Sequence, residues 1–318
     1  MSGAYRALAP AKVNLGLFLG PVRPADGRHE LVSVMQSISL ADELTLERAP
    51  AGASADRLHC PGVPGASDQN LAMRALRLFR ERSGWDAPPL LLSIAKRIPL
   101  AAGLAGGSAD AAAALRLAAA SSGIDDPPLL DELAAELGAD VPAQVRPGRW
   151  LARAAGEALR ELPAPRERFA VLVLALDAEL STASVYAAAD DMQSPRPAAE
   201  LDRLADELAK ELAEGAPLPP ERLLANDLQP AALSLCPPIA DALAQVRSAG
   251  AAHALVSGSG PTVLGLFAPP HAERAAEQAA SRLRERSPRP LVAHPVDARF
   301  ARVIPANDVL VRHNPRNP

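Results

Sequence analysis

The chain has 318 residues, of which 48% are hydrophobic, and its formal net charge at pH 7 is −4. This length and composition are typical of a globular protein with a large core and about two domains, and they exclude an intrinsically disordered chain. The acidic balance argues against a general nucleic-acid binder, which carries a basic surface.

Targeting and metal signals are missing from the sequence. No apolar run approaches the roughly 20 residues that a membrane-spanning helix needs, and no basic segment followed by an apolar stretch opens the chain. We therefore expect a cytoplasmic protein with neither a membrane nor a nucleic-acid partner. The two cysteines, Cys60 and Cys236, are far apart, and the six histidines show no metal-ligand spacing, so neither a disulfide framework nor a zinc site is expected.

The first predicted elements are two long strands and a helix. Residues 4–20 and 31–48 carry the apolar content and alternation of strands, with an Asp-Gly turn between them. Asn70 is a good N-cap for the amphipathic segment that follows it, and Gly84 is expected to end that helix.

A glycine-rich segment, Pro99–Asp110, follows a strand predicted over 90–94 and precedes a helix predicted from Ser108 to about residue 120. Its sequence is P-L-A-A-G-L-A-G-G-S-A-D. Glycines admit positive φ and close approach of a ligand, and a helix N-terminus attracts anions, so the segment predicts a phosphate site. Alternatively, it is an ordinary loop before a helix that Ser108 caps. The common G-x-G-x-x-G and Walker patterns do not match here.

An isolated aspartate follows the next predicted helix. That helix spans 129–137 and ends at Gly138, and the motif G-A-D-V-P comes directly after it. The Val-Pro pair favours extended chain, so Asp140 is expected at a fixed position, where it either bonds its own backbone or acts on a ligand. A further strand is predicted over 149–155.

The second half of the chain predicts helices on one face of an antiparallel sheet, an α+β arrangement. Prolines and a charged R-E-R segment after residue 162 mark a domain boundary. We therefore expect an N-terminal domain over 1–162, a C-terminal domain over 163–304 and a flexible tail over 305–318. The predicted strands are 169–176, 253–257, 262–267 and 291–296, and the predicted helices are 184–190, 200–214, 238–249 and 270–286.

Lysine is rare in this chain. Only Lys12, Lys96 and Lys210 occur among 33 basic residues, and arginine and lysine are not equivalent. Lys12 lies in the apolar run A-P-A-K-V-N-L-G-L-F-L, so its ammonium either extends to solvent or reaches a cleft or an acid. Asn14 lies two residues further and therefore on the same strand face.

Three motifs together resemble the GHMP kinases, the family of galactokinase, homoserine kinase and mevalonate kinase. They are A-K-V-N near residue 12, the glycine-rich loop and S-G-S-G-P-T near residue 259. The segments D-G-R-H-E-L, L-A-D-E-L, G-A-D-V-P, S-T-A-S-V-Y and N-D-L-Q-P are most similar to the 4-diphosphocytidyl-2-C-methyl-D-erythritol kinases. The resemblance implies a two-domain α+β GHMP kinase fold, with a ribosomal-protein-like N-terminal domain and a ferredoxin-like C-terminal domain.

The resemblance also implies a reaction. It is the transfer of the γ-phosphoryl group of ATP, with Mg²⁺, to the 2-hydroxyl of a cytidine-diphosphate-linked methylerythritol on the non-mevalonate route to isopentenyl diphosphate. Asp140 is then the catalytic base, and Lys12 keeps its carboxylate ionised and stabilises the alkoxide. The alternatives are a GHMP kinase for another small alcohol, homoserine or mevalonate, and a non-catalytic RNA-binding relative. We expect a small-molecule partner and a monomer or homodimer.

By the same resemblance, the glycine-rich loop binds the nucleotide. The residues concerned are Pro99, Leu100, Ala101, Ala102, Gly103, Leu104, Ala105, Gly106, Gly107, Ser108 and Ala109. The family has a glycine at the position of Ala105, so this loop must accept a Cβ there. Ser108 is a candidate contact for Mg²⁺, and no other metal ligand is assigned. Asp110 either interacts with the helix dipole or faces the substrate.

The residues expected to bind the acceptor substrate are Asn14, Arg28, His29, Asp140, Thr182 and Tyr186. In the family, a tyrosine at the position of Arg28 stacks on cytosine. A guanidinium can also stack on a base, with Tyr186 as the opposite wall and His29 reading the cytosine edge through backbone or ring hydrogen bonds.

Two further segments have a structural and a functional interpretation. The turn near residue 259 is either a simple hairpin turn or a lid whose N–H groups close over the site. N-D-L-Q-P is expected to be a structural element that Asn226 caps.

Overall fold

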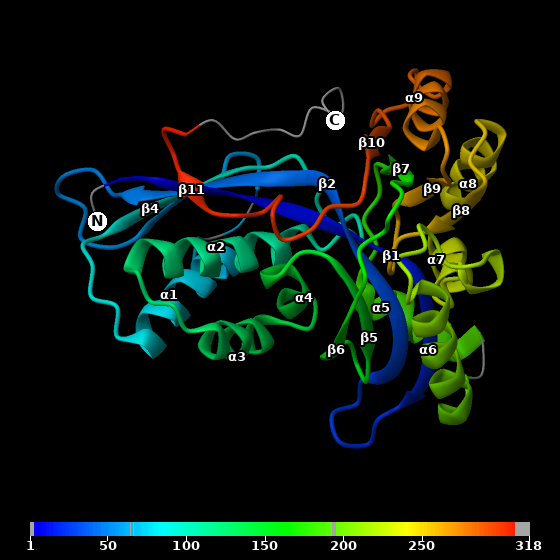
Figure 1. The fold of residues 1–318 in the computed structure, drawn as a ribbon, viewed down its shortest axis with the longest axis horizontal. Helices are drawn as coiled ribbons and strands as arrows, with labels where there is room; N and C mark the ends of the chain where they lie inside the picture. The colour runs from blue at the N-terminus through cyan, green and yellow to red at the C-terminus, as the bar shows by residue number, and fades with distance from the viewer. Residues whose placement is uncertain (1–2, 64, 66, 193–194, 309–318) are drawn as a thin grey trace.

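The protein, represented by a computed structural model, is described over residues 3–63, 65, 67–192 and 195–308. Two β-sheets with helices against them lie side by side (Figure 1). The first sheet has the strand order β11-β1-β2-β4-β3, and β5 pairs with β2 and β6. Its strands are β1 (Tyr5–Val22), β2 (His29–Arg48), β3 (Arg57–His59), β4 (Leu90–Ala95), β5 (Arg149–Arg153), β6 (Ala158–Leu162) and β11 (Ile304–Pro305).

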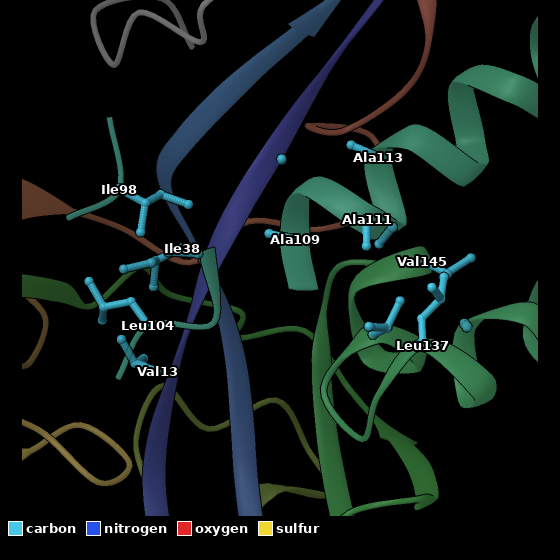
Figure 2. Packing of buried hydrophobic residues seen from close by; sticks show 14 of the residues in the cluster. Val13, Ile38, Ile98, Leu104, Ala109, Ala111, Ala113, Leu137 and Val145 are labelled. Atoms are coloured by element: carbon cyan, nitrogen blue, oxygen red, sulfur yellow. The ribbon is translucent and has the colours of Figure 1, made fainter. Parts of the chain in front are cut away.

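One face of the first sheet is covered by helices. α2 packs directly on β1 and β2, and α1, α3 and α4 pack around α2. The alanine-rich sequence of α2 lets these elements approach closely, and Figure 2 shows its alanines among larger core residues such as Leu137 and Val145. The helix bounds are α1 (Leu71–Ser83), α2 (Gly106–Ser122), α3 (Pro127–Leu137) and α4 (Val141–Val145).

The caps predicted for α1 are confirmed. The Asn70 side chain accepts hydrogen bonds from the backbone N–H groups of Ala72 and Met73, and Gly84 ends the helix in the left-handed conformation. The long strands β1 and β2 also match their predictions within a few residues. Their ladder shifts register between Pro10 and Lys12, so an irregularity lies beside the residues that the sequence singles out.

The second sheet is antiparallel with the order β10-β7-β9-β8. β7 is apolar throughout because both of its faces are buried. Leu172 and Leu174 pack with the helices of this half, whereas Val171 and Val173 pack into the core of the first sheet. The strands are β7 (Ala170–Leu174), β8 (His253–Val256), β9 (Val263–Phe267) and β10 (Leu291–Ala293).

The remaining helices include one that the sequence did not predict. α8 and α9 cover the outer face of the second sheet, α6 packs on β1 and β2, and the unpredicted α7 packs on α5. Their bounds are α5 (Thr182–Met192), α6 (Ala198–Leu212), α7 (Gln229–Leu235), α8 (Pro238–Ser248) and α9 (Ala272–Arg282). In the described part of the chain, no helix combines the length and apolar character that crossing a membrane requires.

Three local predictions were wrong. The Val-Pro pair after Asp140 does not continue as extended chain but begins α4, because proline in the first turn of a helix needs no N–H partner. α2 begins at Gly106 rather than Ser108. Ala105 occupies the N-cap position and makes no side-chain cap bond, so the interpretation of Ser108 as a cap is also wrong.

The C-terminal segment returns to the first sheet. The Val296 N–H donates to the Ser37 carbonyl at 3.0 Å, and Ile304–Pro305 pair with β1. The first residues of the predicted tail are therefore hydrogen-bonded, and residues 309–318 lie outside the described residues. The domain boundary after residue 162 stays a prediction.

Candidate active site

A cleft of about 960 Å³ lies between the two sheets. Segments from both halves of the chain line it, including the glycine-rich loop, β1, β2, α5 and the 258–260 turn. The predicted site residues on its wall are Lys12, Asn14, Arg28, His29, Asp140, Thr182, Tyr186 and the loop from Pro99 to Gly107. Ser108 and Ala109 are not among the lining residues. Ala109 is fully buried in α2, whereas Ser108 is half-buried in the first turn.

The backbone of the glycine-rich loop differs from the expected one. Of its three glycines only Gly103 has a positive φ, +69°, whereas Gly106 and Gly107 lie in the first turn of α2. Ala105 takes the left-handed conformation, with φ 55° and ψ 35°. A glycine adopts that conformation without strain, and alanine does so at a cost of about 1–2 kcal/mol.

The start of α2 has the features of an anion site. No side chain caps it, so its first N–H groups have no intrahelical or side-chain acceptor. The helix dipole adds partial positive charge at the same end. Gly106 and Gly107 present no side chain there, which leaves this backbone open to the cleft.

The turn of the second sheet meets the loop at Gly103. The Ser257 hydroxyl donates to the Gly103 carbonyl at 3.0 Å. Asn226 holds this turn by donating to the carbonyls of Val256 and Gly258, each at 2.8 Å, and caps its own segment by accepting from Leu228 N–H. The predicted capping role of Asn226 agrees with these bonds, and the 258–260 turn both closes a hairpin and lines the cleft.

Lys12 and Asp140 face each other in the cleft. Their Nζ and Oδ1 atoms are 3.6 Å apart, although 128 residues separate them in sequence. Lys12 is 8% exposed, and its Nζ also donates to Asn14 Oδ1 at 2.9 Å. Asn14 in turn donates to the Ser33 hydroxyl at 2.7 Å, which fixes the amide. Asp140 makes no cap bond to α4, so the alternative of a self-bonded turn aspartate does not apply.

A second lysine holds two carboxylates beneath the loop. Lys96 Nζ donates to Asp42 and, at 2.7 Å, to Asp110. Asp42 also accepts from the Ile98 N–H at 2.9 Å, so the cluster ties β2 and the chain entering the loop to α2. Burial raises the pKa of Asp110 to about 7, with Lys96 opposing and Asp42 adding to the shift. The main contact of the Asp110 carboxylate is therefore Lys96, whereas the sequence suggested an interaction with the helix dipole or with the substrate.

His29 and Tyr186 form one end of the cleft. His29 Nδ1 is 2.8 Å from the Gly20 carbonyl, and its Nε2 is 2.9 Å from Asp190 Oδ1. Both ring nitrogens are engaged, which leaves only the backbone of His29 for reading a base. The Tyr186 ring lies 5.5 Å from the His29 ring, and burial raises the pKa of the Tyr186 phenol, which keeps it neutral.

Arg28 lies on the same wall but is anchored. Its Nη2 donates to the Ala155 carbonyl at 2.6 Å, and its Nη1 is 3.8 Å from Glu157. Arg23 also pairs with Glu157, so the β1–β2 turn is tied to the β5–β6 turn. The Arg28 side chain remains 47% exposed, which leaves part of it accessible from the cleft.

The analysis of the sequence missed Asp190 and the partners of Lys96. A signal for Asp190 was present, because Thr182, Tyr186 and Asp190 recur every fourth residue and therefore share one face of α5. The Asp42–Lys96 contact joins residues 54 positions apart and has no local signal. Within the described ranges, no group of three or more His, Cys, Asp or Glu residues is placed to hold a metal ion.

Known proteins with similar sequences are kinases. The family model for the GHMP kinases N terminal domain matches residues 70–148, and the model for GHMP kinases C terminal matches residues 204–286. The 4-diphosphocytidyl-2-C-methyl-D-erythritol kinase of Thermobifida fusca is 43% identical over 282 residues, which cover 86% of this chain and 89% of the relative. The enzyme of the same name from Salinispora arenicola is 39% identical over 270 residues, covering 84% and 85%.

Solved structures agree with the sequence comparison. A crystal structure of 4-(cytidine 5'-diphospho)-2C-methyl-D-erythritol kinase has a TM-score of 0.71 at 33% identity and covers 91% of this chain and 98% of its own. A homoserine kinase from Cytophaga hutchinsonii has a TM-score of 0.68 at 18% identity, covering 96% and 98%, and shares the fold alone. The expected two-domain α+β GHMP kinase fold is thereby confirmed. On these identities and coverages, the chain belongs to the 4-diphosphocytidyl-2-C-methyl-D-erythritol kinase family of the GHMP kinases.

Proposed function

We propose that this chain transfers the γ-phosphoryl group of ATP to the 2-hydroxyl of 4-diphosphocytidyl-2-C-methyl-D-erythritol. The observation that carries the proposal is the Lys12–Asp140 pair, 3.6 Å apart, in a cleft that the glycine-rich loop also lines. Phosphoryl transfer needs a phosphate cradle, charge neutralisation and an oriented nucleophile. In this cleft the glycine-rich loop is the candidate cradle, Lys12 the candidate for charge neutralisation, and Asp140 the candidate that orients the nucleophile.

Asp140 is the general base in this proposal. Its side chain is 39% exposed, lines the cleft and makes no cap bond, so its carboxylate is free to accept the proton of a substrate hydroxyl. Lys12 stabilises the negative charge that develops on the attacking oxygen. Asn14, held between Lys12 and Ser33, orients the same hydroxyl.

The glycine-rich loop and the start of α2 bind the phosphates. The uncapped N–H groups of α2 and its dipole favour a polyanion, and Gly106 and Gly107 allow it to approach the backbone. Mg²⁺ bound with ATP is held mainly by phosphate oxygens and needs only one or two protein ligands. The Ser108 hydroxyl fits that need, because it lies in the first turn of α2 and has no hydrogen-bond partner among the described residues. When bound, Mg²⁺ neutralises charge on the phosphates.

The far end of the cleft accommodates the cytidine group. Tyr186 supplies an aromatic wall and Arg28 a cationic one, and His29 lines the same cleft. Homoserine and mevalonate have no nucleobase that could contact Tyr186 and Arg28. The curated relatives are named as kinases, so the RNA-binding alternative has no support. The monomer or homodimer state stays a prediction.

The proposal is tested by turnover with three acceptors. Purified protein, ATP and Mg²⁺ are supplied with the cytidylated substrate, mevalonate or homoserine, and ADP release and the phosphorylated product are measured. We expect turnover with the cytidylated substrate alone. Preferred phosphorylation of either other acceptor contradicts the substrate assignment.

The role of Asp140 is tested in the same assay. Asp140→Asn should lower kcat by about 10²–10⁴-fold, the usual contribution of a general base. ATP affinity measured by calorimetry should stay unchanged, since Asp140 is assigned to the acceptor. The control is Asp125→Asn, an exposed aspartate in the α2–α3 connection outside the cleft. If Asp140→Asn keeps more than about a tenth of kcat, Asp140 is not the base.

A further inference from the structure

The cleft-facing side of α5 carries three polar residues at helical spacing. Thr182, Tyr186 and Asp190 are four residues apart, so they share one face, and all three line the cleft. Both ends of this face are held in place. Thr182 Oγ1 is 3.1 Å from the Ser259 hydroxyl, and Asp190 Oδ1 is 2.9 Å from His29 Nε2.

The two oxygens of Asp190 have different surroundings. Oδ1 faces a histidine that is only 8% exposed and whose other nitrogen is fixed by the Gly20 carbonyl. The His29 contact therefore sets the orientation of the carboxylate. Oδ2 has no hydrogen-bond partner among the described residues, and the Asp190 side chain is 50% exposed on the cleft wall. One oriented, unpaired acceptor is thus presented one helical turn from Tyr186.

An oriented acceptor discriminates between pyrimidine bases. Cytosine carries an exocyclic amino group, which donates, at the position where uracil carries a carbonyl oxygen, which accepts. A carboxylate oxygen accepts a hydrogen bond from the amino group of cytosine and repels the carbonyl oxygen of uracil. Thr182 and Asp190 are the neighbours of Tyr186 on this face of α5, and Asp190 is the one with an acceptor oxygen that has no partner among the described residues.

We propose that Asp190 accepts a hydrogen bond from the exocyclic amino group of the cytosine ring and makes the site selective for cytidine-linked over uridine-linked substrates. This inference rests on the proposed function and assigns it a specificity-determining residue. His29 acts through Asp190, since its ring nitrogens are both engaged and it orients the carboxylate. The selectivity therefore depends on an oriented hydrogen-bond acceptor rather than on the shape of the cleft alone.

The test uses CDP and UDP as probes in titration calorimetry. Wild-type protein should bind CDP about tenfold or more tightly than UDP, the discrimination expected of one well-placed base contact. Asp190→Ala removes the acceptor, so the two affinities should become equal within about threefold. Asp190→Asn should also bring the two affinities within about threefold, because its amide can accept from the cytosine amino group or donate to the uracil carbonyl. Asp191→Asn, a change at the exposed neighbour on the same helix, should keep the wild-type ratio.

The ratio separates recognition from a merely structural role. If Asp190 only anchors His29, both variants weaken CDP and UDP equally and the ratio is preserved, which overturns the inference. A wild-type protein that binds CDP no more tightly than UDP also overturns it. Thermal unfolding of each variant identifies any that fail to fold, and two different substitutions keep the ratio measurable. Turnover of the cytidylated substrate by wild-type protein tests the proposed function separately, whatever the ratio shows.

Discussion

Gly103 lies where the glycine-rich loop meets the turn of the second sheet. Its φ is +69°, and a Cβ added there would be 2.3 Å from the Ser257 carbonyl oxygen and 3.0 Å from the Gly260 carbonyl oxygen. Both neighbours are backbone atoms, so no flexible side chain can move aside. Gly103→Ala must therefore push the loop away from the turn and break the hydrogen bond from the Ser257 hydroxyl.

The cost of Gly103→Ala has three parts. The left-handed conformation costs alanine about 1–2 kcal/mol, and an overpacked contact costs about 1–3 kcal/mol. The lower entropy of the unfolded alanine chain offsets about 0.4–1 kcal/mol. The net loss is about 1–4.6 kcal/mol, shared between the free energy of unfolding and the binding of ATP. Because about 1.4 kcal/mol is tenfold in affinity, we expect the KM for ATP to rise about tenfold or more unless unfolding absorbs the whole cost.

Gly123 provides a matched control at the other end of α2. It also has a positive φ, +73°, but a Cβ there would have no neighbour within 4 Å. Gly123→Ala therefore carries only the conformational penalty, about 1 kcal/mol of unfolding free energy, and no change in the KM for ATP. Chemical denaturation and steady-state kinetics measure both quantities in each variant. If Gly103→Ala behaves like Gly123→Ala in both, the loop and the turn do not meet as described.

Three further substitutions test the cleft. Lys12→Ala should lower kcat more than it raises the KM for ATP, because Lys12 faces Asp140; an effect on ATP affinity alone would make Lys12 a phosphate ligand. Arg28→Ala should raise the KM for the cytidylated substrate about tenfold without changing the KM for ATP, the expected loss of one stacking contact; a wild-type KM would show that its anchorage at Ala155 is its whole role. Ala105→Gly removes a strained φ and should leave the unfolding free energy unchanged or raise it by up to about 1 kcal/mol; a clear loss by denaturation would mean that the alanine methyl stabilises the loop.

The sequence predicted the elements whose signals are local. The apolar runs of β1, β2 and β7 and the caps of α1 are properties of short segments, and the structure agrees with them within a few residues. The short helices α4 and α7 were missed because five or seven residues cannot form a stable helix alone. Tertiary contacts determine them, such as the Asn226 bonds that precede α7.

The candidate site was predictable in its residues but not in its backbone or its contacts. The resemblance to the GHMP kinases pointed to Lys12 and Asp140, and the fold brings them within 3.6 Å. The glycine-rich sequence did not predict the backbone conformation of the loop. Gly106 and Gly107 belong to α2, whereas Ala105 takes the left-handed conformation. Glycine permits positive φ without requiring it, so the sequence alone cannot say which position of such a loop takes it.

The rarity of lysine turns out to mark the cleft. Lys12 and Lys96 both line it, have side chains that are only 10% and 13% exposed, and contact carboxylates, whereas Lys210 is exposed in the last turn of α6. An ammonium group is compact and can donate in three directions within a narrow space, while a guanidinium is a planar fork with fixed geometry. Lys96 uses this property by donating to Asp42 and Asp110 from different elements. In a chain that otherwise uses arginine for positive charge, two of the three lysines therefore lie where a small, compact cation contacts carboxylates in the cleft.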